Sequence, residues 1–269
     1  MAWRPSTFPV FTFSSMGMRL RSAWELGIES AGALILPREC PICGADSEHS
    51  GVASPFCPDC RDELIDAAGD VCWRCAMPVG PYSRRDGGCG ECRGRALGFD
   101  RAIALGPYQG PIRELCLSLK HEQNGWIAPW LADVLVQGRP ELHHESRGAL
   151  IAPIPLHWWR QWRRGYNQAE ELARGLARRL NLARVNPLRR VISTRKLAGL
   201  GRTERAGLLK NAFKVRARFS KKLAGRTVIL VDDVLTTGAT CGAAARALKK
   251  AGAKRVIALV VARAEGKGH

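Results

Sequence analysis

Residues 228–240, VILVDDVLTTGAT, decide the fold of this 269-residue chain. The first four are apolar and three of these are β-branched, which predicts a strand buried on both faces of a parallel sheet. We expect this strand to end at Asp232. The run of small residues from Ala239 to Ala245 predicts a helix soon afterwards, so the stretch predicts a strand, a loop and a helix in succession.

The loop between strand and helix predicts a binding site for a sugar phosphate. A helix N-terminus presents unpaired N–H groups and the positive end of the helix dipole, and both attract an anion. The carboxylates of Asp232 and Asp233 would repel a phosphate, but they can accept hydrogen bonds from a ribose or hold Mg²⁺ through water. The phosphate would then lie on the loop, where a glycine lets the backbone wrap closely and hydroxyl groups add donors: Thr236, Thr237, Gly238, Ala239 and Thr240.

This stretch resembles the phosphoribosyl pyrophosphate (PRPP) motif of the type I phosphoribosyltransferases. The resemblance implies that Asp232 and Asp233 contact the ribose hydroxyls and that the loop 236–240 holds the 5′-phosphate. The residues alone leave two alternatives, namely aspartates that only cap a helix and a Walker-B-like metal site. The second alternative lacks its partner motif, because the chain contains no G-x-x-x-x-G-K-[ST] loop.

The net charge of +18 is unevenly distributed along the chain. Residues 151–226 carry 20 Lys and Arg against 3 Glu and no Asp, whereas residues 38–100 carry 7 Arg against 11 Asp and Glu. So basic a segment attracts phosphates, either on PRPP or along a nucleic acid, although a solvated basic surface is as common. The chain contains no run of 18 apolar residues, so we expect no membrane span.

The first 37 residues predict an N-terminal extension with one amphipathic helix. Apolar residues recur at helical spacing within 18–36, and Pro37 ends the pattern. Charged residues such as Arg21 and Glu25 interrupt the apolar runs that a secretory signal would need. We therefore expect a cytoplasmic protein.

Eight of the ten cysteines form four C-x-x-C pairs with an internal period of 32 residues. Two such pairs supply four thiolates, which suits tetrahedral Zn²⁺, so we expect two structural zinc ribbons that are closed to substrate. Pairing within each repeat is the simplest arrangement, a cross-braced arrangement is an alternative, and disulfides are a third that a reducing cytosol disfavours. The expected ligands are Cys40, Cys43, Cys57 and Cys60, and then Cys72, Cys75, Cys89 and Cys92.

Residues 102–264 predict an α/β domain, a parallel sheet with helices on both faces, because strands and helices alternate. Ligands of such sheets bind at the carboxyl edge, where the loops emerge. Cys116 lies on an apolar helix stripe, so we expect it in the core and not as a nucleophile. The other expected elements are strands at 102–105, 149–156 and 255–261, helices at 111–121, 126–136, from Gln168 and at 243–251, and a polar loop at 138–148. The predicted parts are thus the extension (1–37), the double zinc ribbon (38–95) and the α/β domain (102–264).

Arginines alternate with tryptophans in HWWRQWRRGYNQ, residues 157–168. Arginine holds phosphate by forked hydrogen bonds and stacks on bases, whereas tryptophans packed under a loop are the alternative. With the cysteine pairs, Leu119-Lys120, KNAF and VILVDDVLTTGAT, the stretch IAPIPLHWWRQWRRGYNQAEELA resembles the ComF family, in which zinc-binding cysteines precede a phosphoribosyltransferase domain. The resemblance implies that the pyrophosphate end of PRPP lies near Arg160, Arg163, Arg164 and Gly165. Lys120 is a further candidate for a phosphate contact.

Two positions depart from similar proteins, which tend to show Thr-x-x-Gln and Arg-x-x-Asn patterns before the PRPP motif. Here Thr194 is followed by Leu197 and Arg205 by Leu208. If the missing polar residues hold the base, their absence weakens the catalytic assignment or changes the acceptor. The basic segment 186–226 around them suits a mobile flap that would close over the sugar phosphate and exclude water.

Two functions follow as hypotheses. The first is an enzyme that transfers phosphoribosyl from PRPP, with Mg²⁺, to a nitrogenous acceptor and releases pyrophosphate. Asp232 and Asp233 would hold the ribose while positive charge develops at its anomeric carbon. The second follows from the link of ComF-like proteins to DNA uptake: a non-catalytic module that binds PRPP, a nucleotide or single-stranded DNA beside a DNA-uptake helicase. For the first hypothesis, nothing in the sequence identifies the acceptor base.

Overall fold

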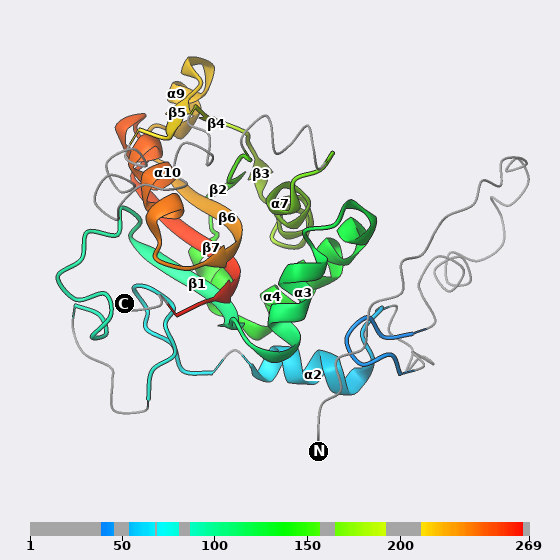
Figure 1. Ribbon diagram of the computed structural model, residues 1–269. Helices are drawn as coiled ribbons and strands as arrows, with labels where there is room; N and C mark the ends of the chain where they lie inside the picture. Colours follow the sequence, from blue (N-terminus) through cyan, green and yellow to red (C-terminus); the bar gives the residue numbers. More distant parts are fainter. Residues whose placement is uncertain are drawn as a thin grey trace, which may run out of the picture. The chain divides into compact units, whose positions relative to one another are not determined.

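The computed structural model describes residues 39–45, 54–67, 69–80, 87–156, 165–191 and 211–265 (Figure 1). The chain divides into two compact units, Met1–Asp62 and Glu63–His269. The larger unit holds the sheet together with the second group of cysteines. No helix within the described ranges is both long and apolar enough to cross a membrane. The helix predicted within 18–36 lies outside them.

Five parallel strands form the central sheet in the order β1-β7-β6-β2-β3 (Figure 1). The apolar residues of the three middle strands, apart from Val234, are buried on both faces, as the sequence predicted for 228–231. The predicted parallel α/β sheet is therefore confirmed. Its strands are β1 (Arg101–Pro107), β2 (Leu150–Pro153), β3 (Ala183–Arg184), β6 (Thr227–Leu235) and β7 (Arg255–Arg263).

The strand that carries the acidic pair is longer than the sequence predicted. We expected it to end at Asp232, but β6 continues to Leu235 and includes both aspartates. Its neighbour β7 explains the difference, because the two strands stay paired through Asp232↔Val260 and Leu235↔Arg263. The loop that follows therefore starts beside the end of β7.

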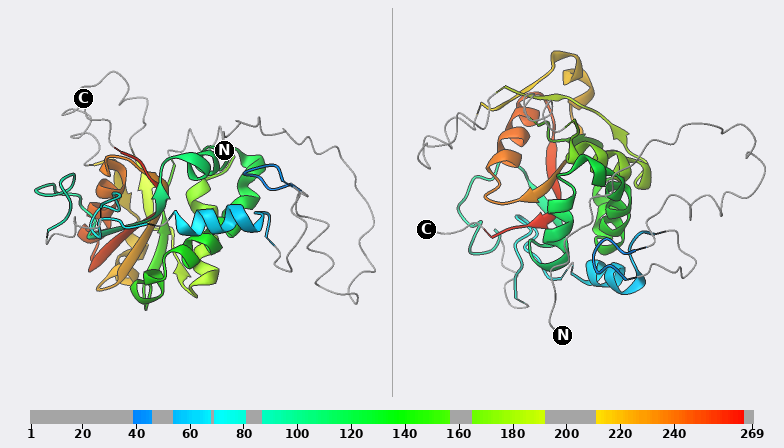
Figure 2. Two further views of the ribbon diagram at one scale, coloured as in Figure 1. Left: turned by 90° about the horizontal axis from the view of Figure 1, so that it is seen from below. Right: turned by 45° about the vertical axis from the view of Figure 1, so that its right-hand side comes forward.

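Helices cover both faces of the sheet (Figures 1 and 2). Val228 and Leu230 of β6 belong to the core beneath α10, whereas Ile229 between them faces the opposite side, where α7 packs on β6 and β2. α3 and α4 complete that second face through their contacts with β7 and β1. The covering helices are α3 (Gly110–Ser118), α4 (Ala128–Gly138), which follows the 3₁₀ turn η1 (Glu122–Ile127), α7 (Gln168–Arg179) and α10 (Ala239–Lys250).

A short helix, α5 (Glu141–Glu145), replaces part of the polar loop predicted at 138–148. Pro140 precedes it, and Glu145 ties it to the sheet through ion pairs of 2.5 Å with Arg101 and with Arg255. The sequence prediction missed this helix because it is short and is held by residues distant in the chain. Its two histidines are exposed, as expected.

The basic segment 186–226 is described only at its two ends. There β4 (Leu188–Arg190) pairs with β5 (Phe213–Val215) in a small antiparallel sheet. The turn η3 (Ala217–Phe219) and the short helix α9 (Ser220–Leu223) then lead to β6. The predicted flap and its departures at Thr194, Leu197, Arg205 and Leu208 lie outside the described residues.

Candidate functional site

Two consecutive carboxylates, Asp232 and Asp233, lie near the carboxyl end of β6. Both side chains are half-buried and turn back on the strand. Oδ1 of Asp232 accepts the N–H of Asp233 at 3.0 Å, and Oδ1 of Asp233 accepts the N–H of Val234 at 2.9 Å. The backbone of the strand thus fixes the direction of both carboxylates.

Gln168, the first residue of α7, is a site residue that the sequence analysis missed. Its Nε2 donates to Oδ2 of Asp233 at 3.3 Å. Its Oε1 is buried and has no hydrogen-bond partner among the described residues. A buried oxygen without a donor is unfavourable, so a ligand hydroxyl or a hydrated cation beside Asp233 would satisfy it. The signal available in the sequence was a polar residue at the start of an apolar helix face.

The electrostatics of the acidic pair favour a bound cation or hydroxyl donors. Burial raises the pKa of Asp232 well above its usual range, the charge of Asp233 raises it further, and Arg190 opposes the increase only in part. Burial and then the same carboxylates raise the thiol pKa of Cys116 in α3 and of Cys241 in α10. Neither thiol is therefore a nucleophile, and the expected core position of Cys116 is confirmed.

The loop after β6 has the backbone that a phosphate cradle requires. Thr236 and Thr237 are exposed, and Gly238 precedes α10 with a φ of +77°, a conformation that favours glycine. A Cβ atom on Gly238 would lie 3.3 Å from the ring of Phe99. Oγ1 of Thr237 accepts the N–H of Ala239 at 3.4 Å, so one threonine already supports the first turn of the helix.

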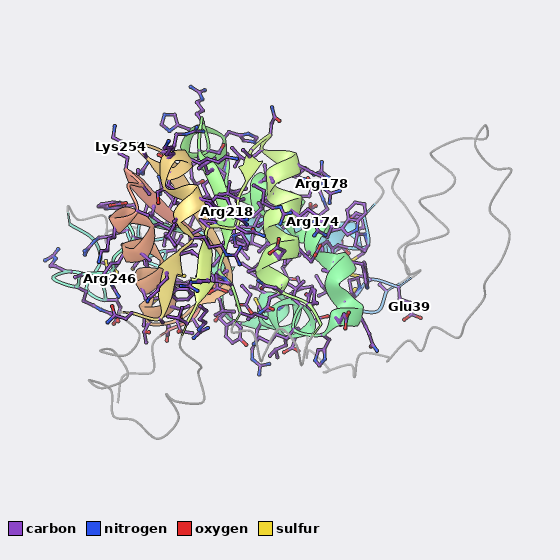
Figure 3. The ribbon with its side chains drawn as sticks, turned by 90° about the horizontal axis from the view of Figure 1, so that it is seen from above. Glu39, Arg174, Arg178, Arg218, Arg246 and Lys254 are labelled. Carbon is purple, nitrogen blue, oxygen red and sulfur yellow. The ribbon has the colours of Figure 1, made fainter. Side chains whose placement is uncertain are left out.

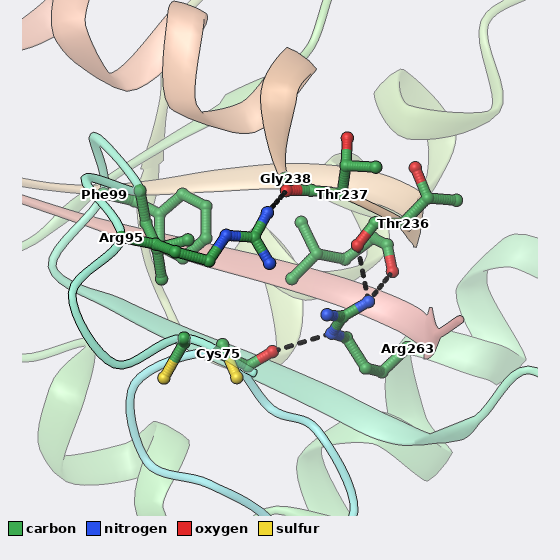
Figure 4. Close-up of a pocket in the computed structure, with 10 residues that line it drawn as sticks. Cys75, Arg95, Phe99, Thr236, Thr237, Gly238 and Arg263 are labelled. Atoms are coloured by element: carbon green, nitrogen blue, oxygen red, sulfur yellow. Dashed lines mark hydrogen bonds between the residues drawn. The ribbon is translucent and has the colours of Figure 1, made fainter. Parts of the chain in front are cut away.

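A small pocket lies on the inner side of this loop (Figure 4). Its walls come from the loop, from Cys75 and residues between Cys92 and Phe99, and from Arg263 at the end of β7. Two arginines that the sequence analysis did not select, Arg95 and Arg263, line it and point toward the loop.

Lys120 and Gly165, both predicted for the pyrophosphate side, belong to two segments that a hydrogen bond joins. The hydroxyl of Tyr166, next to Gly165, donates to the carbonyl of Leu119, next to Lys120. The other predicted residues of this side lie outside the described ranges: Arg160, Arg163 and Arg164.

The paired cysteines form two tetrads, each within one sequence repeat. In each tetrad the four Sγ atoms lie within 4.8 Å of one another. This is the simpler of the pairings left open by the sequence. The tetrads are Cys40, Cys43, Cys57 and Cys60, the last of these on α2 (Pro58–Asp66), and Cys72, Cys75, Cys89 and Cys92.

The sulfur positions fit tetrahedral zinc. Zn–S bonds of about 2.3 Å put the sulfurs of an ideal tetrahedron about 3.8 Å apart. The Sγ–Sγ distances are 3.7 Å for Cys72–Cys92 and 3.5 Å for Cys75–Cys89, and Cys43–Cys57 in the other tetrad is also 3.7 Å. Both tetrads are therefore sites for structural zinc, and four cysteines leave no position for a substrate.

Backbone donors support a thiolate at Cys72 in the second tetrad. The N–H of Cys89 donates to Sγ of Cys72 at 3.3 Å. Burial raises the pKa of Cys72, but N–H donors of Cys75, Arg74 and Cys89 outweigh it and lower the pKa to about 7. Cys72 is thus readily deprotonated, as a zinc ligand must be.

Comparison with known proteins gives matches over most of the chain. Residues 163–269 match the phosphoribosyl transferase domain, and residues 31–93 match the double zinc ribbon domain. The chain is 33% identical over 222 residues to competence protein F of Haemophilus influenzae, covering 77% of this chain and 96% of that protein. It is 31% identical to DNA utilization protein YhgH of Escherichia coli over 69% of this chain and 81% of that protein. It is 28% identical to competence protein ComFC of Bacillus subtilis over 73% of this chain and 78% of that protein.

Proposed function

Because this chain belongs to the ComF family, we propose that it binds PRPP with Mg²⁺ and transfers the phosphoribosyl group to a nitrogenous acceptor, releasing pyrophosphate. The observation that carries the proposal is the order of groups along one continuous segment. A fixed pair of carboxylates on β6 is followed by a hydroxyl-rich loop at the N-terminus of α10. These groups match the two ends of a ribose phosphate, which needs acceptors for its hydroxyls and donors for its phosphate.

In this proposal a different set of protein groups binds each part of PRPP. Asp232 and Asp233 accept hydrogen bonds from the ribose hydroxyls. The loop 236–240 donates backbone N–H groups and threonine hydroxyls to the 5′-phosphate. Lys120 and Gly165, which precedes α7, would lie toward the pyrophosphate, together with Arg160, Arg163 and Arg164.

The transfer breaks the bond between the anomeric carbon and a pyrophosphate oxygen, and the leaving pyrophosphate takes the bonding electrons. The acceptor nitrogen supplies the electron pair for the new bond. Positive charge develops on the ribose between these events, and two carboxylates held in fixed directions stabilise it without reorganisation. Mg²⁺, when bound, would neutralise charge on the pyrophosphate, and the acidic pair with Oε1 of Gln168 are its candidate outer partners through water.

Calorimetry with PRPP and Mg²⁺, followed by a screen of bases for pyrophosphate release, tests this function. Asp233→Asn should lower PRPP affinity at least about tenfold, because it removes a charged acceptor of ribose hydroxyls. Glu171→Gln is a matched control, because it also replaces a carboxylate by an amide but in an ion pair with Arg174 outside the site. Absence of any PRPP binding by the unmodified protein would overturn the proposal.

The second candidate is a non-catalytic accessory protein of DNA uptake. The names of the relatives refer to competence and DNA utilization, and residues 151–226 carry 20 Lys and Arg against 3 Glu. Figure 3 shows labelled basic side chains on several elements, with Arg174 and Arg178 on α7 and Arg218 in η3. A phosphate backbone could contact such a surface without using the acidic pair. The reducing environment that zinc thiolates need makes the cytoplasm the proposed location for either function.

One set of variants distinguishes the two proposed functions. Salt-sensitive binding of single-stranded DNA that survives Asp233→Asn and fails when Arg160, Arg163 and Arg164 become Ala would favour the accessory role. Base-dependent pyrophosphate release that Asp233→Asn abolishes would favour the enzyme.

A further inference from the structure

Arg263, the last residue of β7, is a buried cation whose hydrogen bonds go to main-chain carbonyls. Its side chain is 5% exposed. Nη1 donates to the carbonyl of Leu235 at 2.9 Å and to that of Thr236 at 2.5 Å, and Nε donates to the carbonyl of Cys75 at 2.9 Å (Figure 4). One guanidinium therefore joins the phosphate loop to a cysteine of the second tetrad.

Arg95 also binds a main-chain carbonyl, that of the next residue along the loop. It follows Cys92 closely in the sequence, and its Nη2 donates to the carbonyl of Thr237 at 3.2 Å (Figure 4). Its Nη1 donates to the carbonyl of Glu91 at 3.0 Å, which holds the side chain on the cysteine segment. Two arginines thus bind three consecutive carbonyls, that of Leu235 at the end of β6 and those of Thr236 and Thr237 in the loop, and the first also accepts the N–H of Ala264 at 2.9 Å.

The direction of each carbonyl determines where the N–H group of the same peptide points. In a trans peptide the carbonyl of one residue and the N–H of the next point in opposite directions. Holding the carbonyls of 235, 236 and 237 against the arginines therefore directs the N–H groups of Thr236, Thr237 and Gly238 away from them. None of these three N–H groups donates to an acceptor in the part of the chain that the structure describes. They form a row of free donors at the N-terminus of α10.

The charge of Arg263 acts in the same direction. It forms no ion pair with a carboxylate among the described residues, and its hydrogen bonds hold the guanidinium beneath the loop. A guanidinium bound to a carbonyl also polarises that peptide, which makes its N–H a stronger donor. Both effects favour an anion on the far side of the loop.

We propose that Arg263 and Arg95 are positioning residues of the phosphate loop, and that the second cysteine tetrad is through them a structural part of the 5′-phosphate site. They aim and polarise three backbone donors without touching the ligand. This inference rests on the proposed function, since it assigns to the loop the phosphate of a sugar phosphate. It adds two residues and a metal-binding segment to the 5′-phosphate end of the site, which otherwise consists of the end of β6, the loop and the start of α10.

Titration with ribose 5-phosphate and, separately, with magnesium pyrophosphate tests the proposal. Arg95→Ala should weaken ribose 5-phosphate binding about threefold to tenfold, and Arg263→Lys about tenfold to a hundredfold, because lysine keeps the charge but cannot fork between carbonyls. Pyrophosphate affinity should change by less than about twofold, since its binding groups lie elsewhere. A general loss of folding would lower both affinities together.

Two control variants match the test variants. Arg93→Ala removes an exposed arginine from the same segment as Arg95. Arg139→Lys changes another buried arginine, which donates to the carbonyls of Ala104 and Leu105 on β1. Neither control should alter ribose 5-phosphate affinity, although Arg139→Lys should lower the melting temperature.

The amide resonance of Gly238 supplies a readout that stability alone does not move. In the unmodified protein it should shift on addition of ribose 5-phosphate, and the shift should be reduced in Arg95→Ala at saturating ligand. Variants that bind ribose 5-phosphate as tightly as the unmodified protein, with the same Gly238 shift, would overturn this inference and leave the proposed function standing. An unmodified protein that binds neither ribose 5-phosphate nor PRPP would overturn the proposed function and this inference with it.

Discussion

Asp232 is the residue at which stability and proposed function conflict. Burial and the charge of Asp233 raise its pKa, so the folded state binds its proton more tightly than the unfolded state does. The ionised form is therefore unfavourable in the free protein. The contribution of Asp232 to stability falls as the pH rises above the unfolded-state pKa of about 4, until the folded-state pKa is passed.

Asp232→Asn should accordingly stabilise the free protein at neutral pH. We expect the melting temperature to rise by roughly 2–4 °C, the shift that about 1 kcal/mol produces in a protein of this size. The gain should disappear below about pH 4, where the aspartate is protonated in both states. Thermal unfolding at pH 7 and pH 3.5 measures both effects, and saturating PRPP with Mg²⁺ should stabilise only the unmodified protein. A variant less stable than the unmodified protein at pH 7 would contradict this reading of Asp232.

Site residues that form one local pattern could be predicted from the sequence, and those that depend on distant contacts could not. Asp232, Asp233 and the loop 236–240 share one strand, loop and helix, whose chemistry is visible in consecutive letters. Arg263 reaches Cys75 across 188 residues, and Arg95 reaches Thr237 across 142. An arginine at the end of a buried strand has no local feature that separates it from any other.

The same distinction holds for the secondary-structure elements. The periodic helices and the buried strands β6 and β7 were predicted because apolar spacing alone identifies them. The length of β6 and the helix α5 were not, since the first depends on a neighbouring strand and the second on ion pairs with Arg101 and Arg255. Pairing partners decide where an element ends, and the sequence pattern decides where its centre lies.

At the start of α10, Gly242 allows a contact between that helix and the chain that leaves the second tetrad. A Cβ atom at Gly242 would lie 2.1 Å from the carbonyl oxygen of Leu97, and one at Gly98 would lie 2.5 Å from the carbonyl oxygen of Gly242. Such distances leave no room for a methyl group. The two glycines therefore let α10 and the residues next to Arg95 pack backbone to backbone.

Gly242→Ala should destabilise the protein even though alanine is the better helix former. Helix propensity favours alanine by about 1 kcal/mol, but the overlap is with backbone, which cannot rotate away, and overpacking costs about 1–3 kcal/mol. We expect a net loss of about 1–2 kcal/mol in urea unfolding, with weaker ribose 5-phosphate binding, because the helix and Arg95 would move apart. Gly90→Ala, where nothing lies within 4 Å of the added Cβ, is the control and should be close to neutral. An equally small effect of both substitutions would argue against a tight contact.

Across the whole molecule, the two tetrads come from two copies of the same sequence repeat but belong to different compact units. Cys72, Cys75, Cys89 and Cys92 lie in the unit of the sheet, whereas most of the first repeat lies in the other. A duplication would by itself predict two equivalent zinc ribbons. The hydrogen bonds from Arg263 to Cys75 and from Arg95 to Thr237 instead give the second ribbon a task in the phosphate site.

Removing one metal at a time should reveal that difference. Cys40→Ser with Cys43→Ser, and separately Cys72→Ser with Cys75→Ser, should each reduce the zinc content from two ions per chain to one, because each tetrad loses half its ligands. PRPP affinity should fall at least about tenfold only in the second variant, since a serine at 75 keeps the carbonyl that Arg263 binds but loses the metal that fixes its position. Atomic absorption and calorimetry measure the two quantities, and circular dichroism checks that the sheet persists. Equal PRPP affinity in the two variants would mean that the second zinc ribbon supports only its own fold.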